Sequence, residues 1–335
     1  MNLPSYFKDF LAEIEPSASY KKDQQEGHAT LRRRLAEDEE FRLVHINTFL
    51  QGSYRRNTAI HPGKDVDIIV VTSLKPNQTA PAKANAILST CLKKYYKEVT
   101  PQERSFCVNL SYVTMDVVIA TSPYLSGKNG LMELARKAED INEKSDWAKY
   151  PLLIPDRSLG NWVETHPKAQ IAWTSDLNAA GGGYFVPLVK MCKWWRNVTY
   201  KLPKYPKGYV LERLVGECVD KSKRDNATGF VQLIENLRSE YSASASLGIV
   251  PHLPDPGIPS HNVAHHLTAE DFKTFLEKIV AAVPIAREAL KEDDVQKSVA
   301  LWRRLFGEKF PAAPTAKAIF PPTPVRPNKP AGFAL

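Results

Sequence analysis

Two aliphatic runs that carry acidic residues constrain the fold of this chain more than any other feature. The first is DVDIIVVT, residues 65–72, and the second is MDVVIA, residues 115–120. Each run is short and rich in β-branched residues, which is typical of a buried strand. Because successive side chains of a strand alternate between its two faces, Asp65 and Asp67 project from the same face. Burial of an isolated charge is strongly unfavourable, so Asp116 in the second run needs a partner.

If the two strands are neighbours, three carboxylates converge at one edge of a sheet. Carboxylate oxygens are hard ligands that suit Mg²⁺ or Mn²⁺. Two such ions can hold the attacking and leaving oxygens of a displacement at phosphorus. The alternative for Asp65 taken alone is a solvated turn residue at the start of a strand. The set of Asp65, Asp67 and Asp116 favours a metal site.

A Gly-Ser pair precedes the first acidic strand by about a dozen residues. Gly52 lets the backbone approach a ligand closely, and the Ser53 hydroxyl and the N–H groups of a following helix can hold phosphate oxygens. Arg55, Arg56 and Lys64 would add positive charge nearby. Gly-Ser by itself is typical of a turn followed by a helix cap. Its spacing from the acidic strand is what indicates a phosphate site.

The order of the elements predicts an α/β lobe followed by a helical lobe. At 335 residues the chain exceeds the roughly 250–300 residues at which a single core usually divides. We expect helices at 5–14 and 20–39, then a mixed sheet, within a first lobe of residues 1–155. Beyond about residue 160 strands become hard to find, which predicts a helical lobe over 156–311. Residues 312–335 are rich in proline and predict a flexible tail.

Composition narrows the classes of protein without choosing one. The net charge of +8 favours partners that carry phosphate. The four cysteines, at positions 91, 107, 192 and 218, stand far apart and indicate neither a zinc ribbon nor a disulfide framework. The first residues lack the pattern of a signal peptide, and no run reaches the length of a membrane span. We expect a cytoplasmic protein that does not bind membranes.

Residues of the second half offer weaker candidates. Lys190 and Lys193 lie one helical turn apart, so both can face a cleft between the two lobes and contact the phosphates of a bound nucleotide. The alternative is that they flank a buried face formed by Trp194 and Trp195, with only the ammonium groups in water. Asn262, in a proline-rich connector, either orders that connector by capping or contacts a base, and capping is the simpler interpretation.

The motifs together resemble the DNA polymerase β-like nucleotidyltransferase superfamily. The residues that carry this resemblance are Gly-Ser-Tyr at 52–54, Asp-Val-Asp at 65–67 and the third aspartate at 116. Four further segments resemble bacterial CD-NTases, relatives of cyclic GMP-AMP synthase and oligoadenylate synthase that act in CBASS antiphage defence; they are residues 154–173, 188–196, 255–263 and 300–311. The resemblance covers about residues 1–311.

The resemblance implies a two-lobed enzyme with its active site in the cleft between a nucleotidyltransferase core and a helical lobe. Asp65 and Asp67 would bind two Mg²⁺ ions, and Asp116 would bind the catalytic one and favour deprotonation of the attacking ribose hydroxyl. Gly52 and Ser53 would hold the triphosphate of the donor. The expected reaction joins NTPs, ATP and GTP above all, into a cyclic di- or trinucleotide second messenger without a template, and releases pyrophosphate.

The resemblance also bears on partners. The zinc-binding insertion of the animal DNA sensors is missing from the sequence, so no DNA activator is expected. In many CD-NTase systems a ubiquitin-transfer-like ancillary protein conjugates the C-terminus, and the tail ending in AGFAL is compatible with that use. Two alternatives stay open. One is an enzyme that tails RNA or modifies a small acceptor, and the other is a pseudoenzyme that binds nucleotide or RNA.

Overall fold

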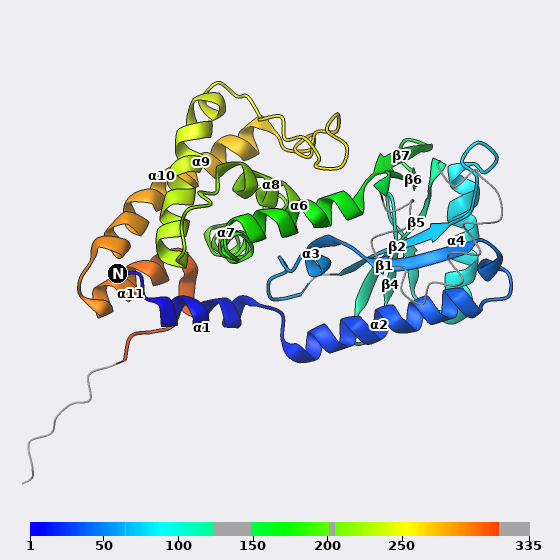
Figure 1. Cartoon of the computed structure of the whole chain (residues 1–335), viewed down its shortest axis with the longest axis horizontal. Coiled ribbons are helices and arrows are strands. Elements are labelled where there is room, and N and C mark those ends of the chain that lie inside the picture. Colours follow the sequence, from blue (N-terminus) through cyan, green and yellow to red (C-terminus); the bar gives the residue numbers. More distant parts are fainter. Residues whose placement is uncertain (64, 124–148, 201–204, 315–335) are drawn as a thin grey trace, which may run out of the picture.

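A mixed sheet occupies one end of the molecule and a group of helices the other (Figure 1). The computed structural model describes residues 1–63, 65–123, 149–200 and 205–314. The predicted α/β core followed by a helical part is confirmed. Lys64 and the proline-rich tail from residue 315, both singled out in the sequence, lie outside the described residues.

The strands of the described ranges form one seven-stranded sheet. Its main path runs β1-β2-β5-β4-β3, and β6 and β7 extend it from β5. β2 and β5 are parallel, and the other neighbouring pairs are antiparallel. The sheet is therefore mixed, as predicted. The strands are β1 (His45–Leu50), β2 (Val66–Thr72), β3 (Val99–Pro101), β4 (Phe106–Asn109), β5 (Thr114–Thr121), β6 (Leu152–Asp156) and β7 (Asn161–Thr165).

Two helices cover one face of this sheet. α2 (Ala18–Glu37) and α4 (Pro81–Tyr95) bury leucines such as Leu31 and Leu88 against alternate residues of β2 and β5. The opposite face has a smaller cluster that includes Ile69 of β2 and Val118 of β5. Because Asp67 alternates with Ile68, it belongs to this second face. The acidic side chains are therefore turned away from α2 and α4.

The helical lobe has one continuous apolar core. The predicted helices of the second half are confirmed, and the first helix of the chain joins them through Phe7, Phe10 and Ile14. None of the helices in the described ranges is long and apolar enough to cross a membrane. The lobe consists of α1 (Pro4–Ile14), α6 (Pro167–Ala180), α7 (Phe185–Thr199), α8 (Gly208–Cys218), α9 (Asn226–Ser246), α10 (Ala269–Lys291) and α11 (Val295–Phe306).

The β6-β7 hairpin differs from the sequence-based expectation that strands end before residue 160. β7 continues to Thr165, and α6, which the sequence did not predict as a helix, follows at once. Pro155 and a tight turn interrupt the strand pattern, which is why it was missed. Buried Asp156 orders this turn, because its carboxylate accepts hydrogen bonds from the Leu159 N–H and from Arg104.

The irregular connector between α9 and α10 is held by two polar side chains. Asn262 accepts hydrogen bonds from the backbone N–H groups of Leu253 and Ala264, each at 3.0 Å. Asp255 accepts one from Gly257 and a 2.7 Å bond from Gln170 of α6. The predicted structural role of Asn262 is thus confirmed.

Candidate active site

The two acidic strands lie side by side, as the sequence predicted. β2 and β5 pair in parallel with Asp67 directly opposite Asp116. Asp65 precedes the first residue of β2 and is exposed. The sheet therefore brings together two strands and the three acids that they carry.

Burial and mutual repulsion make Asp116 the most perturbed of the three. Burial first, and then the charges of Asp65 and Asp67, raise the pKa of Asp116 to about 6, although a hydrogen bond from Gln102 acts in the opposite direction. Its Oδ1 atom is buried and has no hydrogen-bond partner among the described residues. An unsatisfied carboxylate oxygen beside two further acids is an electrostatic arrangement that a cation would stabilise.

This donor set fits a divalent metal ion. Carboxylate oxygens on neighbouring strands supply the hard ligands that such ions require, and the orphaned Oδ1 of Asp116 has no competing partner in the described parts of the chain. Within these parts, no three acidic, histidine or cysteine side chains already converge on one point. The three acids are therefore carried by two neighbouring strands without forming a closed ligand set among the described residues.

Gly52 is in direct contact with the acidic strand. β1 ends at Leu50, and the short helix α3 (Gly52–Arg55) begins where the Gln51 N–H donates a 2.9 Å hydrogen bond to the Asp67 carbonyl. Gly52 has φ +69°, and a Cβ atom there would lie 1.8 Å from Asp67 Oδ2. Only glycine fits this position. The contact explains why the Gly-Ser pair and the acidic strand occur together in the sequence.

A cleft of about 810 Å³ opens beside this contact. Its wall on the sheet side includes Gly52, Ser53 and Asp67, and Lys193 of α7 lies on the helical side. Figure 1 shows α3 between the sheet and the helical lobe. Four of the predicted site residues therefore line a single cavity.

The two candidate lysines occupy different environments. Lys193 lines the cleft, is buried, and donates a 3.0 Å hydrogen bond to the Thr58 carbonyl. Lys190 is buried outside the cleft lining and forms a 2.7 Å ion pair with Glu15. Of the pair next to them, Trp195 is buried and Trp194 is partly buried. The structure therefore matches neither expectation for Lys190, which does not line the cleft and whose ammonium group pairs with Glu15 instead of lying in water.

The arginines after the Gly-Ser pair also diverge. Arg55 is exposed and is not part of the cleft wall, whereas Arg56 is buried and lines the cleft. Arg56 lies over the ring of Tyr209, with its guanidinium carbon 4.7 Å from the ring centroid. Which of two adjacent arginines turns inward depends on the path of the chain after α3, which the sequence pattern alone does not specify.

The cleft contains residues that sequence reasoning missed. Arg196 of α7 and Gln170 of α6 both line it. Arg196 is buried, donates a 2.5 Å hydrogen bond to the Pro206 carbonyl, and leaves its Nε atom without a partner among the described residues. The sequence signal for Arg196 was its position one helical turn after Lys193, on the same face of a largely apolar helix. Burial of a further cation there is unfavourable unless it has a partner.

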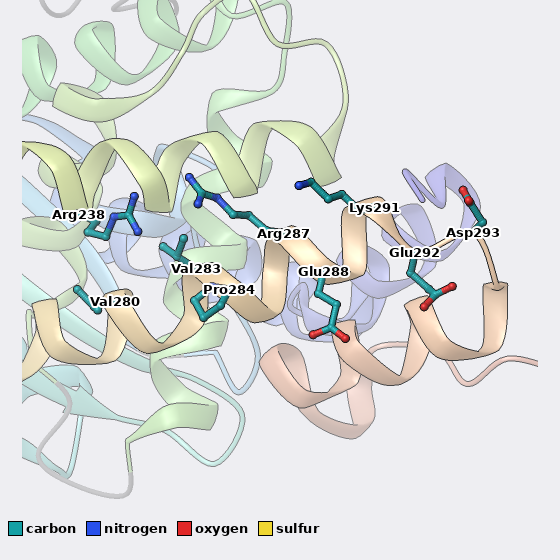
Figure 2. A pocket seen from close by; sticks show the side chains of 9 residues that line it. All are labelled: Arg238, Val280, Val283, Pro284, Arg287, Glu288, Lys291, Glu292 and Asp293. Carbon is teal, nitrogen blue, oxygen red and sulfur yellow. The ribbon is translucent and has the colours of Figure 1, made fainter.

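A second hollow lies on the outside of the helical lobe, between α9 and α10 (Figure 2). Its lining mixes three basic with three acidic side chains: Arg238, Arg287 and Lys291, and Glu288, Glu292 and Asp293. None of the predicted site residues is among them. Of the predicted site residues, Gly52, Ser53, Asp67 and Lys193 line the cleft, whereas Asp65, Asp116, Arg55 and Lys190 line neither hollow.

Comparison with known proteins identifies the family of this chain. A model of the second messenger oligonucleotide or dinucleotide synthetase domain matches residues 1–140. A probable cyclic AMP-AMP-GMP nucleotide synthase from Salmonella paratyphi B is 41% identical, over 93% of this chain and 92% of the relative. A cyclic AMP-AMP-AMP synthase from Acinetobacter is 37% identical, over 100% and 98%.

Solved structures share this fold. The solved structure of Escherichia coli MS115-1 CdnC with ATP has a TM-score of 0.66 at 17% identity, and the match covers 92% of this chain and 99% of that one. The resemblance inferred from the motifs is confirmed by relatives that extend along nearly the whole chain. The chain belongs to the bacterial CD-NTase family, which makes it a nucleotidyltransferase of a class that generally uses divalent metal ions.

Proposed function

We propose that this enzyme joins ATP, with or without GTP, into a cyclic trinucleotide that serves as a second messenger in antiphage defence. Relatives at 37–41% identity are named for cyclic AMP-AMP-GMP and cyclic AMP-AMP-AMP synthesis. The single observation that carries the site assignment is the contact of Gly52 with Asp67, across from Asp116 on the paired strand. It supports a phosphate-binding segment beside Asp67, which lines the cleft and pairs across the strands with Asp116.

The chain's own residues would position the reactants. Gly52 and Ser53 would hold the donor triphosphate, since the lack of a Cβ at Gly52 lets phosphate oxygens approach both the backbone and Asp67. Asp65, Asp67 and Asp116 would hold Mg²⁺, which lowers the pKa of an attacking hydroxyl and stabilises the charge that develops as pyrophosphate leaves.

Cyclisation would use the same residues again. A linear intermediate released from the donor position would turn so that its own triphosphate lies on Gly52 and Ser53. Its free ribose hydroxyl would then attack its own α-phosphate and displace pyrophosphate. A single cleft of about 810 Å³ has room for more than one nucleotide. One set of acids could therefore catalyse each bond in turn.

A product assay tests the proposal. The purified chain is incubated with the four NTPs and Mg²⁺ or Mn²⁺, treated with phosphatase, and analysed by mass spectrometry beside Asp65→Ala/Asp67→Ala. We expect a phosphatase-resistant cyclic nucleotide that the double variant does not make. Extension of RNA ends in place of a cyclic product would establish the RNA-tailing alternative. Consumption of no NTP under any of these conditions would contradict an active synthase.

A separate proposal concerns the tail, which lies outside the described residues. We propose that a ubiquitin-transfer-like ancillary protein conjugates the C-terminus in the cytoplasm during infection. The sequence supports it only through a proline-rich arm ending in AGFAL. Normal phage defence by a strain truncated after residue 314, in a locus that encodes such a partner, would refute it.

A further inference from the structure

A fully buried carboxylate lies behind the cleft wall, and neither the motifs nor the chemistry above assign it a role. Glu212 of α8 has no exposed surface. Its Oε1 accepts hydrogen bonds from Arg56 Nε at 2.8 Å and Thr174 Oγ1 at 2.9 Å. Its Oε2 accepts them from Thr58 Oγ1 at 2.9 Å and Lys193 Nζ at 3.4 Å. Each carboxylate oxygen thus accepts at least two hydrogen bonds.

These donors come from both lobes. Arg56 and Thr58 belong to the segment that joins α3 to β2, while Thr174 is on α6 and Lys193 on α7. Lys193 also donates to the carbonyl and to the hydroxyl of Thr58, at 3.0 and 3.1 Å. One carboxylate therefore fastens the sheet lobe to the helical lobe.

The two neighbouring cations hold Glu212 in its ionised form. Burial alone would raise the pKa of Glu212, but Lys193 and Arg56 more than offset this and keep the pKa below its ordinary value. Burial lowers the pKa of Lys193 to about 8, against the opposing effect of Glu212. A buried charge with this many hydrogen bonds is costly to disturb.

Arg56 and Thr58, which donate hydrogen bonds to Glu212, lie at the end of the turn that carries Gly52 and Ser53. The Arg56 N–H donates to the Gly52 carbonyl at 3.1 Å, and the Thr58 N–H donates to the Ser53 carbonyl at 2.9 Å. Gly52 in turn lies against the Asp67 carboxylate. A continuous path of hydrogen bonds and contacts runs from Glu212 to the acidic strand.

We infer that Glu212 is a positioning residue that fixes the segment from Gly52 to Thr58 and so sets where the donor triphosphate lies relative to Asp67. The inference rests on the proposed function, because it takes Gly52 and Ser53 to hold the triphosphate. It assigns to the helical lobe a direct part in NTP binding through a residue that is sealed from the substrate.

The test compares two identical substitutions on the same helix. Glu212→Gln keeps the shape of the side chain and removes its charge. Glu217→Gln is the matched control. Glu217, like Glu212, pairs with an arginine, here Arg213 at 2.5 Å, but its side chain is 45% exposed. The full chain is titrated calorimetrically with a non-hydrolysable ATP analogue and Mg²⁺, and the folded fraction is followed by circular dichroism.

We expect Glu212→Gln to raise the Kd for the analogue about tenfold, equivalent to roughly 1.4 kcal/mol, and Glu217→Gln to leave it unchanged. A purely structural role for Glu212 would reduce the number of binding sites per chain and leave the Kd of the folded molecules at the wild-type value. The separation of stoichiometry from Kd therefore distinguishes positioning from stability.

A second pair of variants covers the case in which Glu212→Gln does not fold. Thr58→Val and Thr174→Val each delete one 2.9 Å bond to Glu212 without changing the size of the side chain. Only Thr58 lies in the segment that carries Gly52 and Ser53, and its hydroxyl also accepts from Lys193. We expect Thr58→Val to raise the Kd about threefold and Thr174→Val to raise it less.

The outcomes separate this inference from the function on which it rests. Failure of the wild-type chain to bind the analogue would overturn the proposed function. If the wild type binds while Glu212→Gln or, where that variant is unfolded, Thr58→Val keeps the wild-type Kd, the positioning role of Glu212 is wrong and the proposed function stands.

Discussion

The edge of the sheet and the buried cluster around Glu212 use the same kinds of charge in opposite ways. At the edge, three acids repel one another, and Asp116 leaves a buried oxygen without a partner among the described residues. Around Glu212, both carboxylate oxygens have several donors, and two cations face the single carboxylate. Within the described ranges, the first region has unpaired negative charge, and in the second every oxygen of the carboxylate is hydrogen-bonded.

The contrast indicates which region sets activity and which sets rigidity. Unbalanced charge destabilises the fold until a cation arrives, a common feature of active sites. A buried cluster of paired charges instead fixes geometry, because breaking one of its bonds leaves an unpaired charge in a low-dielectric interior. The acidic edge and the Glu212 cluster lie on either side of the turn that carries Gly52. We therefore expect substitutions in the first to reduce turnover and substitutions in the second to reduce stability and nucleotide affinity.

Loss of the Asp116 charge should have the largest effect on turnover. Asp116→Asn keeps the shape of the side chain but removes a ligand charge, and we expect kcat to fall about 10³-fold. The measurement is cyclic product per enzyme at saturating NTP. The control is Asp176→Asn, on an exposed position of α6, which should retain wild-type turnover. Activity of Asp116→Asn above a tenth of wild type would remove this acid from the metal site.

The same acid-to-amide change should alter stability with opposite sign in the two regions. In chelator at pH 7.5, Glu212→Gln should lower the free energy of unfolding by about 3 kcal/mol, because it leaves buried cations unpaired. Asp116→Asn should raise it by about 1 kcal/mol, a value reduced for the partial exposure of this carboxylate. Urea denaturation measures both changes.

The pH dependence of the Asp116→Asn effect follows from its pKa. The folded-state pKa of about 6 lies above the ordinary value of 3.8, so the destabilisation caused by ionised Asp116 builds up as the pH rises from 3.8 and is complete above about 6. The gain from Asp116→Asn should therefore shrink as the pH falls from 7.5 towards 4. A gain that stays constant over this range would show that repulsion is not its cause.

Substitution of Gly52 tests the contact that joins the two regions. Gly52→Ala places a Cβ where Asp67 Oδ2 now lies, and we expect kcat to fall about 10²-fold as the carboxylate is displaced. Gly160→Ala is the matched control, since Gly160 has φ +66° with no atom within 4 Å of the added Cβ. Both variants should lose roughly 1–2 kcal/mol of stability from the strained backbone. Equal turnover in the two would show that the close approach to Asp67 is unimportant.

The acidic edge was predictable from the sequence because its signals are local. Alternation along a strand places Asp65 and Asp67 on one face, and the two aliphatic runs with acids predict two strands whose acids converge if the strands are neighbours. The Gly-Ser spacing supplied the third element. Each of these inferences depends on only a few consecutive residues, and the relation of Asp67 to Asp116 then follows from strand pairing.

The buried cluster was not predictable in the same way. Its bonds join residues up to 156 positions apart, and nothing near Arg56 in the sequence names Glu212 as its partner. Glu212 does sit one turn after Tyr209 on the apolar side of α8, so a buried acid could have been suspected from helical spacing. Its partners depend on how the two lobes pack, which a local pattern cannot specify.

Substitutions of Lys190 and Lys193 are expected to have the smallest effects. They compare, within α7, a lysine outside the cleft with one that belongs to the Glu212 cluster. Lys190 pairs with Glu15, whose side chain is 32% exposed, so Lys190→Met should lower the free energy of unfolding by only about 1 kcal/mol. Lys193 lines the cleft and belongs to the Glu212 cluster. Lys193→Met should therefore weaken binding of the ATP analogue by about tenfold, and Lys190→Met by less than about threefold. Calorimetric titration of the two variants decides the order. The reverse order would mean that Lys190 leaves Glu15 to bind phosphate, and that this part of the helical lobe rearranges when nucleotide enters.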